Sequence, residues 1–386
     1  MSNRPNLILA GGGHVHVEVL RRLAIRPSAR DLFAEITLIS PESSLSYSGL
    51  LPATIAGHIE RQASRIDIAA LAEAARVDCR WTTLTRVDAN RRRIRTADQA
   101  ELEYRLLSLD IGAEPVSVAG ADQAHVIPVK PVSKLWAGLD RIEHALQQRG
   151  HGPAIAVIGG GAGGVELALS LAHRWRHHPG APRITLFARG DRLMASHEAS
   201  VRDQVERAMI YSNINVATNT PIQRIESDRV VAENGHRFTA DAVFVATGAR
   251  PPTAWRADDL ALDEQGFVQV DAHLASISHP DVRAAGDIAA LPEPRPKSGV
   301  YAVRAAPTLA ANLEQSAQNR ALYRFKAQKH ALALITLGDR RAIASRGWPI
   351  APTGYAPWCL KNMIDRRFVA RYQHLARQSD STLDSV

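Results

Sequence analysis

One glycine-rich segment occurs twice in the chain, and this duplication constrains the fold more than any other feature. The segment LILAGGGHVHVE at residues 7–18 returns as IAVIGGGAGGVE at residues 155–166, an offset of 148 residues. The same offset relates the triplet ITL at residues 36–38 to ITL at residues 184–186. A shared offset over two separate segments predicts that one structural unit is present in two copies.

Each copy has the pattern of a strand that turns into a helix. An apolar run ending in G-x-G predicts a buried parallel strand followed by a sharp turn. The glycines are Gly11 and Gly13 in the first copy, and Gly159, Gly161 and Gly164 in the second. Without a Cβ, the backbone can approach a pyrophosphate, whose charge then lies on the free N–H groups of the helix N-terminus. The chain is therefore expected to contain two dinucleotide-binding units.

Two further segments extend the pattern. LLSLDIGAEP is similar to VFVATGARPP, with Gly112 and Gly248 as equivalent residues after a buried strand. The later segment DVRAAGDIAAL predicts a strand that ends at Gly286 and Asp287. A carboxylate there is suited to bond sugar or ribityl hydroxyls. An N-cap role in a following helix is the alternative, and the same residue can fill both roles.

The order GGG, IGGGAGGVE, ATG and AGD resembles the flavoproteins of the pyridine nucleotide-disulfide oxidoreductase superfamily, over nearly the whole chain. The second glycine loop and the AGD segment look most like type II NADH:quinone dehydrogenases. SYSGLLPATIAGHI (46–59) and GVYAVRAAPTLAANL (299–313) are closer to a bacterial subgroup associated with selenide water dikinase. The resemblance implies an α/β fold of two three-layer, Rossmann-like domains, the second inserted in the first, with FAD as cofactor and NAD(P)H as substrate.

The same resemblance suggests how the chain is divided. Residues 1–115 and 250–325 are expected to form the FAD-binding domain, and residues 116–249 the NAD(P)-binding domain. The remaining residues, 326–386, are expected to form a small α+β interface segment, with a hairpin turn at Gly338 and Asp339.

The interface segment also carries a helical pattern at about 357–372. Leu360, Ile364 and Phe368 form an apolar stripe with Met363 beside them. Such a stripe requires burial. It is expected to pack inside the molecule or in a homodimer, with peripheral membrane contact as the alternative.

On the flavin side, the resemblance places the wrapping chain at Leu51 and Pro52. The first copy departs from the family pattern at two points. His16 replaces the third glycine, with His14 before it. Both histidines are expected to pack or to contact phosphate, with a catalytic role as the alternative. Ser40 stands where an acidic residue usually holds the ribose, so a weaker hydroxyl contact is expected.

On the nicotinamide side, Arg189 follows the second strand in place of an acid, which favours NADPH over NADH. Glu166 resembles the glutamate near nicotinamide and flavin in type II dehydrogenases, where it positions the nicotinamide or passes a proton. A helix first-turn glutamate is the alternative, as Glu18 in the first copy indicates. Tyr301 is a second catalytic candidate, placed to stack or bond at the flavin edge or only to pack. It lies in GVYAV, where type II dehydrogenases carry Ala-Gln near the quinone.

Composition excludes several other classes. Two cysteines, Cys79 and Cys359, lie far apart and form no C-x-x-C pair, which disfavours disulfide reduction and a sulfide:quinone reductase. The net charge of +8 favours anionic ligands, but the cluster at residues 91–95 contains no aromatic residues and is interpreted as a solvated hairpin, not a nucleic-acid site. No metal site is predicted. The first strand starts so early that no cleavable signal is expected, which indicates the cytoplasm, with the inner membrane face as the alternative.

These observations predict an FAD-dependent oxidoreductase that takes hydride from NAD(P)H and passes electrons to a second acceptor. A quinone is the leading acceptor by resemblance, followed by a selenium or sulfur compound. The alternative from another class is a flavin- and nucleotide-binding redox sensor or partner-binding protein with slow turnover.

Overall fold

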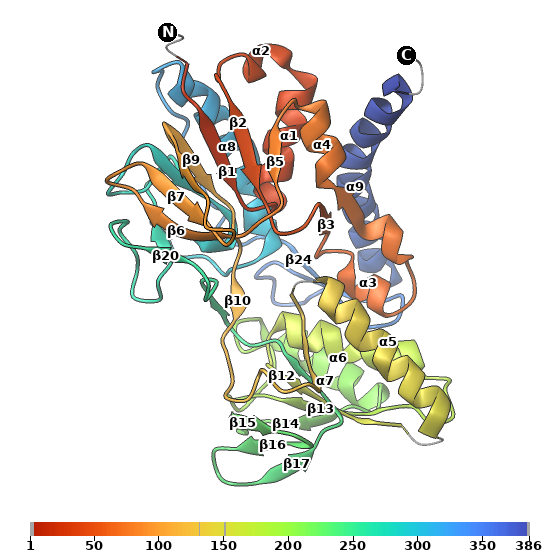
Figure 1. Cartoon of the computed structure of the whole chain (residues 1–386). Coiled ribbons are helices and arrows are strands. Elements are labelled where there is room, and N and C mark those ends of the chain that lie inside the picture. The colour runs from red at the N-terminus through yellow and green to blue at the C-terminus, as the bar shows by residue number, and fades with distance from the viewer. Residues whose placement is uncertain (1–3, 131, 150–151, 384–386) are drawn as a thin grey trace.

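The computed structural model describes residues 4–130, 132–149 and 152–383 (Figure 1). Two parallel five-stranded sheets form two lobes, one above the other in Figure 1. The first sheet has the strand order β22 (Val282–Ala284), β9 (Leu106–Leu109), β1 (Leu7–Ala10), β2 (Ile36–Ile39) and β5 (Asp78–Arg80). The second has the order β11 (Val126–Pro128), β18 (Ala242–Val245), β12 (Ala154–Ile158), β13 (Arg183–Phe187) and β14 (Asn215–Ala217). The predicted α/β fold with two Rossmann-like units is confirmed.

The pairing registers of the two sheets are equivalent. Leu7 pairs with Ile36 in the first sheet, and Ile155 pairs with Ile184 in the second, at the same offset as the glycine loops. On the other side of the central strand, Leu7 pairs with Leu106 and Ile155 pairs with Ala242. The repeat in the sequence is therefore also a repeat in three dimensions.

Each sheet is covered on both faces. Helices α1 (His14–Ile25), α4 (Ile68–Ala74) and α8 (Gly299–Ala317) pack with the first sheet, together with the small sheet of β20 (Arg256–Ala257), β6 (Leu84–Asp88), β7 (Arg93–Thr96) and β8 (Glu101–Glu103). On the second sheet, one core is shared with α5 (Val132–Arg149), α6 (Ala162–Trp175) and α7 (Ala199–Tyr211). The other core is shared with β15 (Ile222–Glu226), β16 (Arg229–Ala232) and β17 (Arg237–Thr239). Strands buried on both faces explain the continuous apolar runs in the sequence.

Several short elements connect and complete the lobes. The chain crosses between the lobes along β10 (Glu114–Pro115) and β19 (Ala249–Arg250), which pair antiparallel. The others are α2 (Pro27–Arg30), β3 (Ser44–Ser46), α3 (Leu51–Ile55), η1 (Arg61–Ser64), β4 (Arg65–Asp67), β21 (Val268–Gln269), η2 (Gly286–Ile288) and β23 (Ala289–Ala290).

The C-terminal segment contacts both lobes. Its hairpin of β24 (Ala333–Thr336) and β25 (Ala342–Ser345), extended by β26 (Thr353–Gly354), confirms the predicted turn at Gly338. Ile335 and Ile343 from this hairpin are buried in the helical core of the second lobe. Helix α9 (Tyr355–Leu383) is longer than predicted and places Phe368 and Tyr372 in the core of the first lobe.

The apolar stripe of α9 is therefore divided. Phe368 is 8% exposed, whereas Leu360, Ile364 and Met363 are 38%, 45% and 59% exposed. Internal packing is confirmed for Phe368, whereas Leu360, Met363 and Ile364 lie on the surface.

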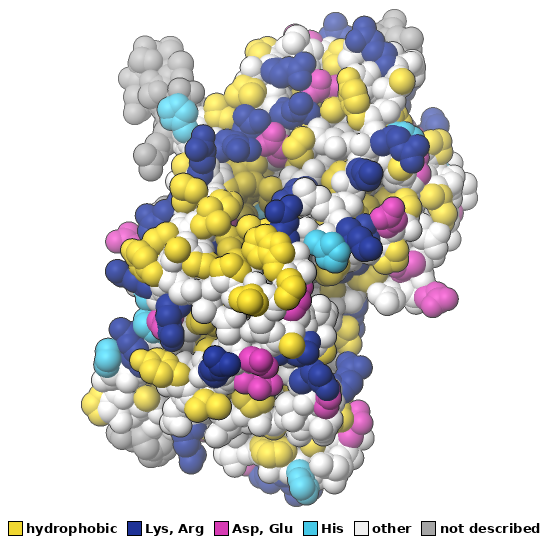
Figure 2. Space-filling view, turned by 180° about the vertical axis from the view of Figure 1, so that it is seen from behind, with side chains coloured by type: hydrophobic (Ala, Val, Ile, Leu, Met, Phe, Trp, Pro, Cys, Tyr) yellow, Lys and Arg dark blue, Asp and Glu magenta, His cyan; other side chains and the backbone are white. Residues whose placement is uncertain are grey.

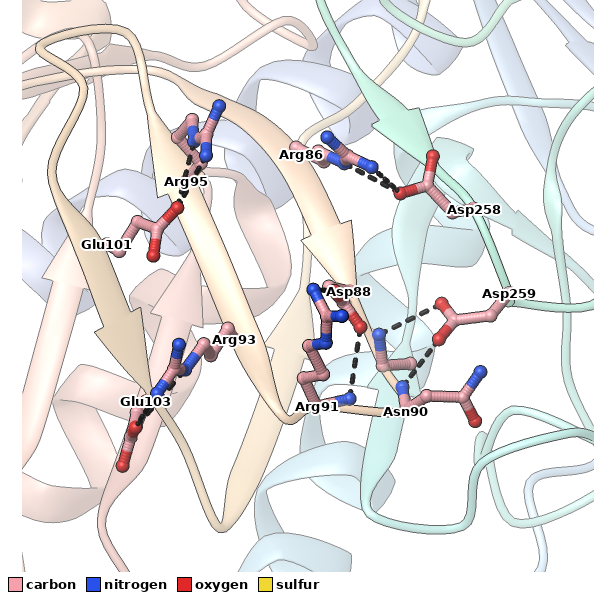
Figure 3. A network of polar contacts seen from close by, with 11 residues as sticks. Arg86, Asp88, Asn90, Arg91, Arg93, Arg95, Glu101, Glu103, Asp258 and Asp259 are labelled. Carbon is pink, nitrogen blue, oxygen red and sulfur yellow. Dashed lines mark hydrogen bonds and ion pairs between the residues drawn. The ribbon is translucent and has the colours of Figure 1, made fainter.

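The arginine cluster at residues 91–95 lies on the predicted hairpin, at the turn after β6 and along β7. Figure 3 shows the arginines of this region beside acidic partners: Arg93 with Glu103, Arg95 with Glu101, Arg91 with Asp88 and Arg86 with Asp258. Arg92 pairs with Asp281 at 2.8 Å. Paired arginines present much less positive potential than the sequence count suggests.

Candidate active site

A large cleft runs past both glycine loops and measures about 2800 Å³. Its walls come from the carboxyl ends of both sheets and from β3, α3, α8 and β24. Every residue predicted for the site lines this cleft except Gly164. The carboxyl ends of parallel strands are where open α/β sheets bind ligands.

The second glycine loop shows why each glycine is needed. Gly159 has a φ of +135°, and a Cβ there would lie 2.2 Å from the carbonyl oxygen of Ala246. A Cβ on Gly164 would lie 1.9 Å from the carbonyl oxygen of Gly159, so this glycine permits close packing of helix on strand. Cβ atoms on Gly161 and Gly163 would meet no atom within 4 Å. The first turn of α6 thus leaves room for a pyrophosphate.

The first glycine loop makes the same turn with a different third residue. Gly11 has a φ of +104°, and a Cβ there would lie 2.1 Å from the carbonyl oxygen of Asp110. His16, buried at the position equivalent to Gly164, places Nδ1 2.6 Å from the Gly11 carbonyl and Nε2 2.8 Å from Ser108 Oγ. Because a carbonyl only accepts, Nδ1 carries the proton. Burial lowers the pKa of His16 to about 4, so it is a neutral packing residue.

Asp110 joins the first loop to the AGD turn, and the sequence reasoning missed it. Its Oδ2 accepts the backbone N–H groups of Val15 at 2.8 Å and of His16 at 3.2 Å. Cβ atoms on Gly13 and Gly286 would lie 2.3 Å and 2.5 Å from its carboxyl oxygens. The carboxyl group therefore fills the space between the two segments predicted to hold the pyrophosphate and the ribityl chain.

Asp287 lies beside Asp110 on the wall of the cleft. It is in the first turn of η2, whose N-cap is Ala285, so the alternative of an N-cap role for Asp287 is wrong. Its Oδ2 lies 3.8 Å from Nζ of Lys130, which enters from the chain just before α5. Lys130 is a cation of the cleft wall that the sequence reasoning did not single out.

The predicted wrapping chain forms one wall of the flavin side. Leu51 and Pro52 open α3, and Tyr301 lies in the first turn of α8. His14, in the first turn of α1, packs its ring edgewise on Tyr47 with centroids 5.4 Å apart. Burial and Lys130 lower the pKa of His14 to about 4, so it too is neutral.

Ser40 is buried, and its side chain forms a hydrogen bond within the turn that follows β2. Its hydroxyl donates to the Glu42 carbonyl at 2.7 Å, and Glu42 Oε1 accepts from Ser133 on α5 at 2.8 Å. The end of β2 is thus tied to the other lobe, with both Ser40 and Glu42 on the wall of the cleft.

Glu166 lies where the two lobes and the C-terminal segment meet. Its Oε1 accepts the backbone N–H and the hydroxyl of Thr336, each at 2.8 Å. Burial raises the pKa of Glu166, whereas the charge of Lys361 and the Thr336 bonds lower it. A carboxylate placed in this way, half-buried and bonded to donors, is suited to hold and release a proton.

An ion pair of α9 completes this end of the cleft. Lys361 Nζ donates to the Gly49 carbonyl at 2.7 Å and to Asp365 Oδ2 at 2.8 Å. Asp365 also accepts from the Tyr47 hydroxyl at 3.2 Å. Lys361 and Asp365 line the cleft although they come from the far end of the sequence.

The residues that follow β13 are those that the sequence analysis linked to nucleotide specificity. Ala188 is buried at the end of β13, and the exposed Arg189 lines the cleft. Arg192 pairs with Asp191 at 2.6 Å and is not on the cleft wall. Of these two arginines, Arg189 is thus the one that faces the cleft.

The cysteines have no place in this site. Cys79 lies on β5 and Cys359 on α9, and neither lines the cleft. Among the residues the structure describes, no group of three His, Cys, Asp or Glu side chains has the geometry of a metal site.

The fold and the cleft define a class, since two glycine loops face one cleft in a protein built to bring two dinucleotides together. Residues 8–306 match the family model described as pyridine nucleotide-disulphide oxidoreductase, and the chain belongs to that family. It is accordingly an oxidoreductase that works with FAD and NAD(P)H. The fit is physical, because the glycine turns leave open space over α6 and the cleft carries Lys130 and Arg189 for anionic phosphates.

Related proteins agree with this assignment. The chain is 26% identical over 294 residues to the NADH dehydrogenase-like protein YutJ of Bacillus subtilis, covering 74% of this chain and 77% of that protein. It is 27% identical over 219 residues to the NADH dehydrogenase-like protein Rv1812c of Mycobacterium tuberculosis, covering 54% of each.

Solved structures share the fold at low identity. The sulfide:quinone oxidoreductase of Aquifex aeolicus superposes with a TM-score of 0.75 at 18% identity, covering 96% of this chain and 92% of that chain. NDH2 of Plasmodium falciparum in complex with NADH gives a TM-score of 0.75 at 15% identity, covering 98% of each chain. No helix among the described residues is long and apolar enough to span a membrane.

Proposed function

We propose that the chain oxidises NADPH and reduces a quinone, by way of FAD held in the first glycine loop. The balanced reaction is NADPH, a proton and a quinone giving NADP⁺ and a quinol. The observation that carries the proposal is the continuous cleft, which is lined by both glycine loops and by apolar side chains of the C-terminal segment.

The donor side rests on the second glycine loop and Arg189. The open first turn of α6 offers free N–H groups to the pyrophosphate. A guanidinium matches a 2′-phosphate by charge and geometry, and no acid stands in this place to prefer a 2′-hydroxyl.

The acceptor side rests on apolar side chains that α8 and the C-terminal segment contribute to the cleft wall. They are Leu332, Leu334, Ile335, Val300 and Ile364. Such a wall suits an uncharged ring better than a charged sulfur or selenium compound. The NADH dehydrogenase-like names of the curated relatives and the fold shared with NDH2 and a sulfide:quinone oxidoreductase support the same direction.

When bound, FAD supplies the two-electron chemistry that links donor and acceptor. The chain's own residues orient the partners and manage the proton. We infer that Glu166, held by Thr336 of the C-terminal segment, holds or moves the proton that the quinone gains. Tyr301 and the Leu51-Pro52 segment would shape the flavin side of the cleft, and Asp287 would hold the ribityl chain.

The exposed part of α9 is the proposed contact with a membrane surface, where a quinone dissolves. Figure 2 shows hydrophobic side chains gathered on the side of the molecule that carries α9, bordered by Lys and Arg. On α9, Leu360 and Met363 are exposed, and the exposed Arg366 and Arg367 follow about one turn after Met363. Apolar contacts flanked by basic residues suit an anionic lipid interface.

The proposal is tested by acceptor specificity of the purified flavoprotein. With NADPH as donor, we expect rapid reduction of a soluble short-chain quinone, and slower reduction of polysulfide or selenite. Fast turnover with a sulfur or selenium compound, and none with quinones, would overturn the quinone assignment. Tight nucleotide binding without turnover on any acceptor would instead favour the redox sensor.

A further inference from the structure

We propose that Asp110 is an FAD-binding residue that acts in its neutral, proton-bearing form, so that the retention of FAD depends on one buried proton. The inference rests on the FAD site assigned above and concerns how that site tolerates an anionic cofactor. It is independent of which acceptor is reduced.

The carboxyl group of Asp110 is buried at the wall of the cleft. Asp110 is 4% exposed and lies on the wall of the cleft, against the first turn of α1. That turn is where a pyrophosphate binds in a dinucleotide fold. Oδ2 of Asp110 already accepts hydrogen bonds from the N–H groups of Val15 and His16. These are two of the donors that the helix would otherwise offer to phosphate.

The second copy shows what the first has changed. A Cβ on Gly11 would meet the carbonyl of Asp110, as a Cβ on Gly159 would meet the carbonyl of Ala246, so these two residues are equivalent. The second loop has a methyl group where the first has a carboxyl group. The dianionic pyrophosphate of FAD would therefore face a second negative charge if Asp110 were ionised.

The groups around Asp110 determine whether its carboxyl group is charged. The groups that act on Asp110 are His16 on α1, Asp287 on η2 and Lys130 before α5. His14 lies next to Val15 in the same first turn of α1. Both histidines are neutral, and Asp287 disfavours a second carboxylate. The N–H bonds from His16 and Val15 and the charge of Lys130 favour the ionised form, but burial outweighs them. Burial raises the pKa of Asp110 to about 8, and Asp287 adds to this effect.

The proton has one suitable place. Because Oδ2 accepts two N–H bonds, the proton belongs on Oδ1, the oxygen 2.5 Å from a Cβ built on Gly286. A neutral Asp110 then contributes one donor to the cleft wall, whereas an ionised Asp110 contributes only repulsion. FAD binding favours the protonated form, so the affinity is full at low pH and falls as pH rises through the pKa of Asp110.

The test is FAD release from the purified flavoprotein, followed by flavin fluorescence after dilution between about pH 6.5 and 9.5. For wild type, we expect the FAD dissociation constant to rise above about pH 8, approaching tenfold per pH unit. Asp110→Asn keeps the shape, and Asp110→Ala installs the residue of the second copy. Both variants should lose this rise while keeping the folded circular dichroism spectrum.

Lys130→Gln provides a control with a predicted direction. It removes the charge that favours the ionised carboxyl group, so the rise should move to higher pH. Equal pH dependence in wild type and Asp110→Asn would overturn the proposal. A wild-type protein that purifies with no flavin would overturn the FAD site itself, which is a separate outcome from failed turnover of a loaded protein.

Discussion

At the scale of residues, the duplication places one glutamate in two roles. Glu18 and Glu166 are equivalent in sequence, but Glu18 is buried and accepts bonds from Arg21 at 2.8 Å and Tyr372 at 3.1 Å. Glu166 lines the cleft and is bonded by Thr336. The same helix position therefore serves packing in one copy, and we propose that it serves chemistry in the other.

This contrast gives a matched pair of variants. Glu166→Gln should slow acceptor reduction about 100-fold, because general acid–base groups contribute on that order. Since the pKa of Glu166 is raised, the wild-type rate should fall as pH rises through it, and the variant should not show this fall. Stopped-flow reoxidation by a soluble quinone across pH measures both.

Glu18→Gln is the control for that experiment. It should keep the rate and the pH profile but lose about 1–3 kcal/mol of stability, because it weakens charge-assisted bonds. A flat wild-type profile, or equal rate losses in the two variants, would show that Glu166 only packs.

At the scale of elements, the glycine loops tie sequence to structure most closely. The offset of 148 residues predicts both turns, and the register of the sheets repeats it. What the sequence could not predict comes from distant segments. Lys361 reaches Gly49 across the chain. Asp110 lies in a position where the second copy has alanine, and only that comparison with Ala246 could have marked it.

The third glycine of the second loop gives a stability prediction. Gly164→Ala forces a Cβ to within 1.9 Å of a backbone oxygen, so α6 must move away from its strand. We expect the thermal midpoint to fall by roughly 5 °C or more. Gly163→Ala meets nothing within 4 Å and should keep or slightly raise the midpoint, because alanine favours helix. Equal midpoints for the two variants in differential scanning fluorimetry would contradict this explanation.

Helix α9 gives a prediction about the membrane surface. Met363→Glu places a charge on the exposed apolar stretch and should weaken binding to vesicles containing anionic lipid about tenfold, as measured by flotation. Ile25→Glu makes the same change at a site of similar exposure, 46% against 59%, at the end of α1, and should leave vesicle binding unchanged. Unchanged flotation of Met363→Glu would remove α9 as the membrane contact.

At the scale of the whole molecule, the C-terminal segment ties the two lobes together. Its hairpin packs in the core of one lobe, and α9 packs in the core of the other. We propose the boundaries 1–115 with 250–325, 116–249 and 326–386 as the functional division of the chain. The order of glycine motifs predicted the two lobes, whereas the Thr336 and Lys361 contacts depend on packing between residues far apart in sequence.

We expect nicotinamide and flavin to react with each other in this one cleft. Anaerobic stopped-flow mixing of the flavoprotein with NADPH or NADH separately, followed by the loss of flavin absorbance, tests it most directly. We predict fast bleaching with NADPH, slower bleaching with NADH, and loss of the difference in Arg189→Ser. A fully loaded flavin that neither nucleotide bleaches would contradict the claim.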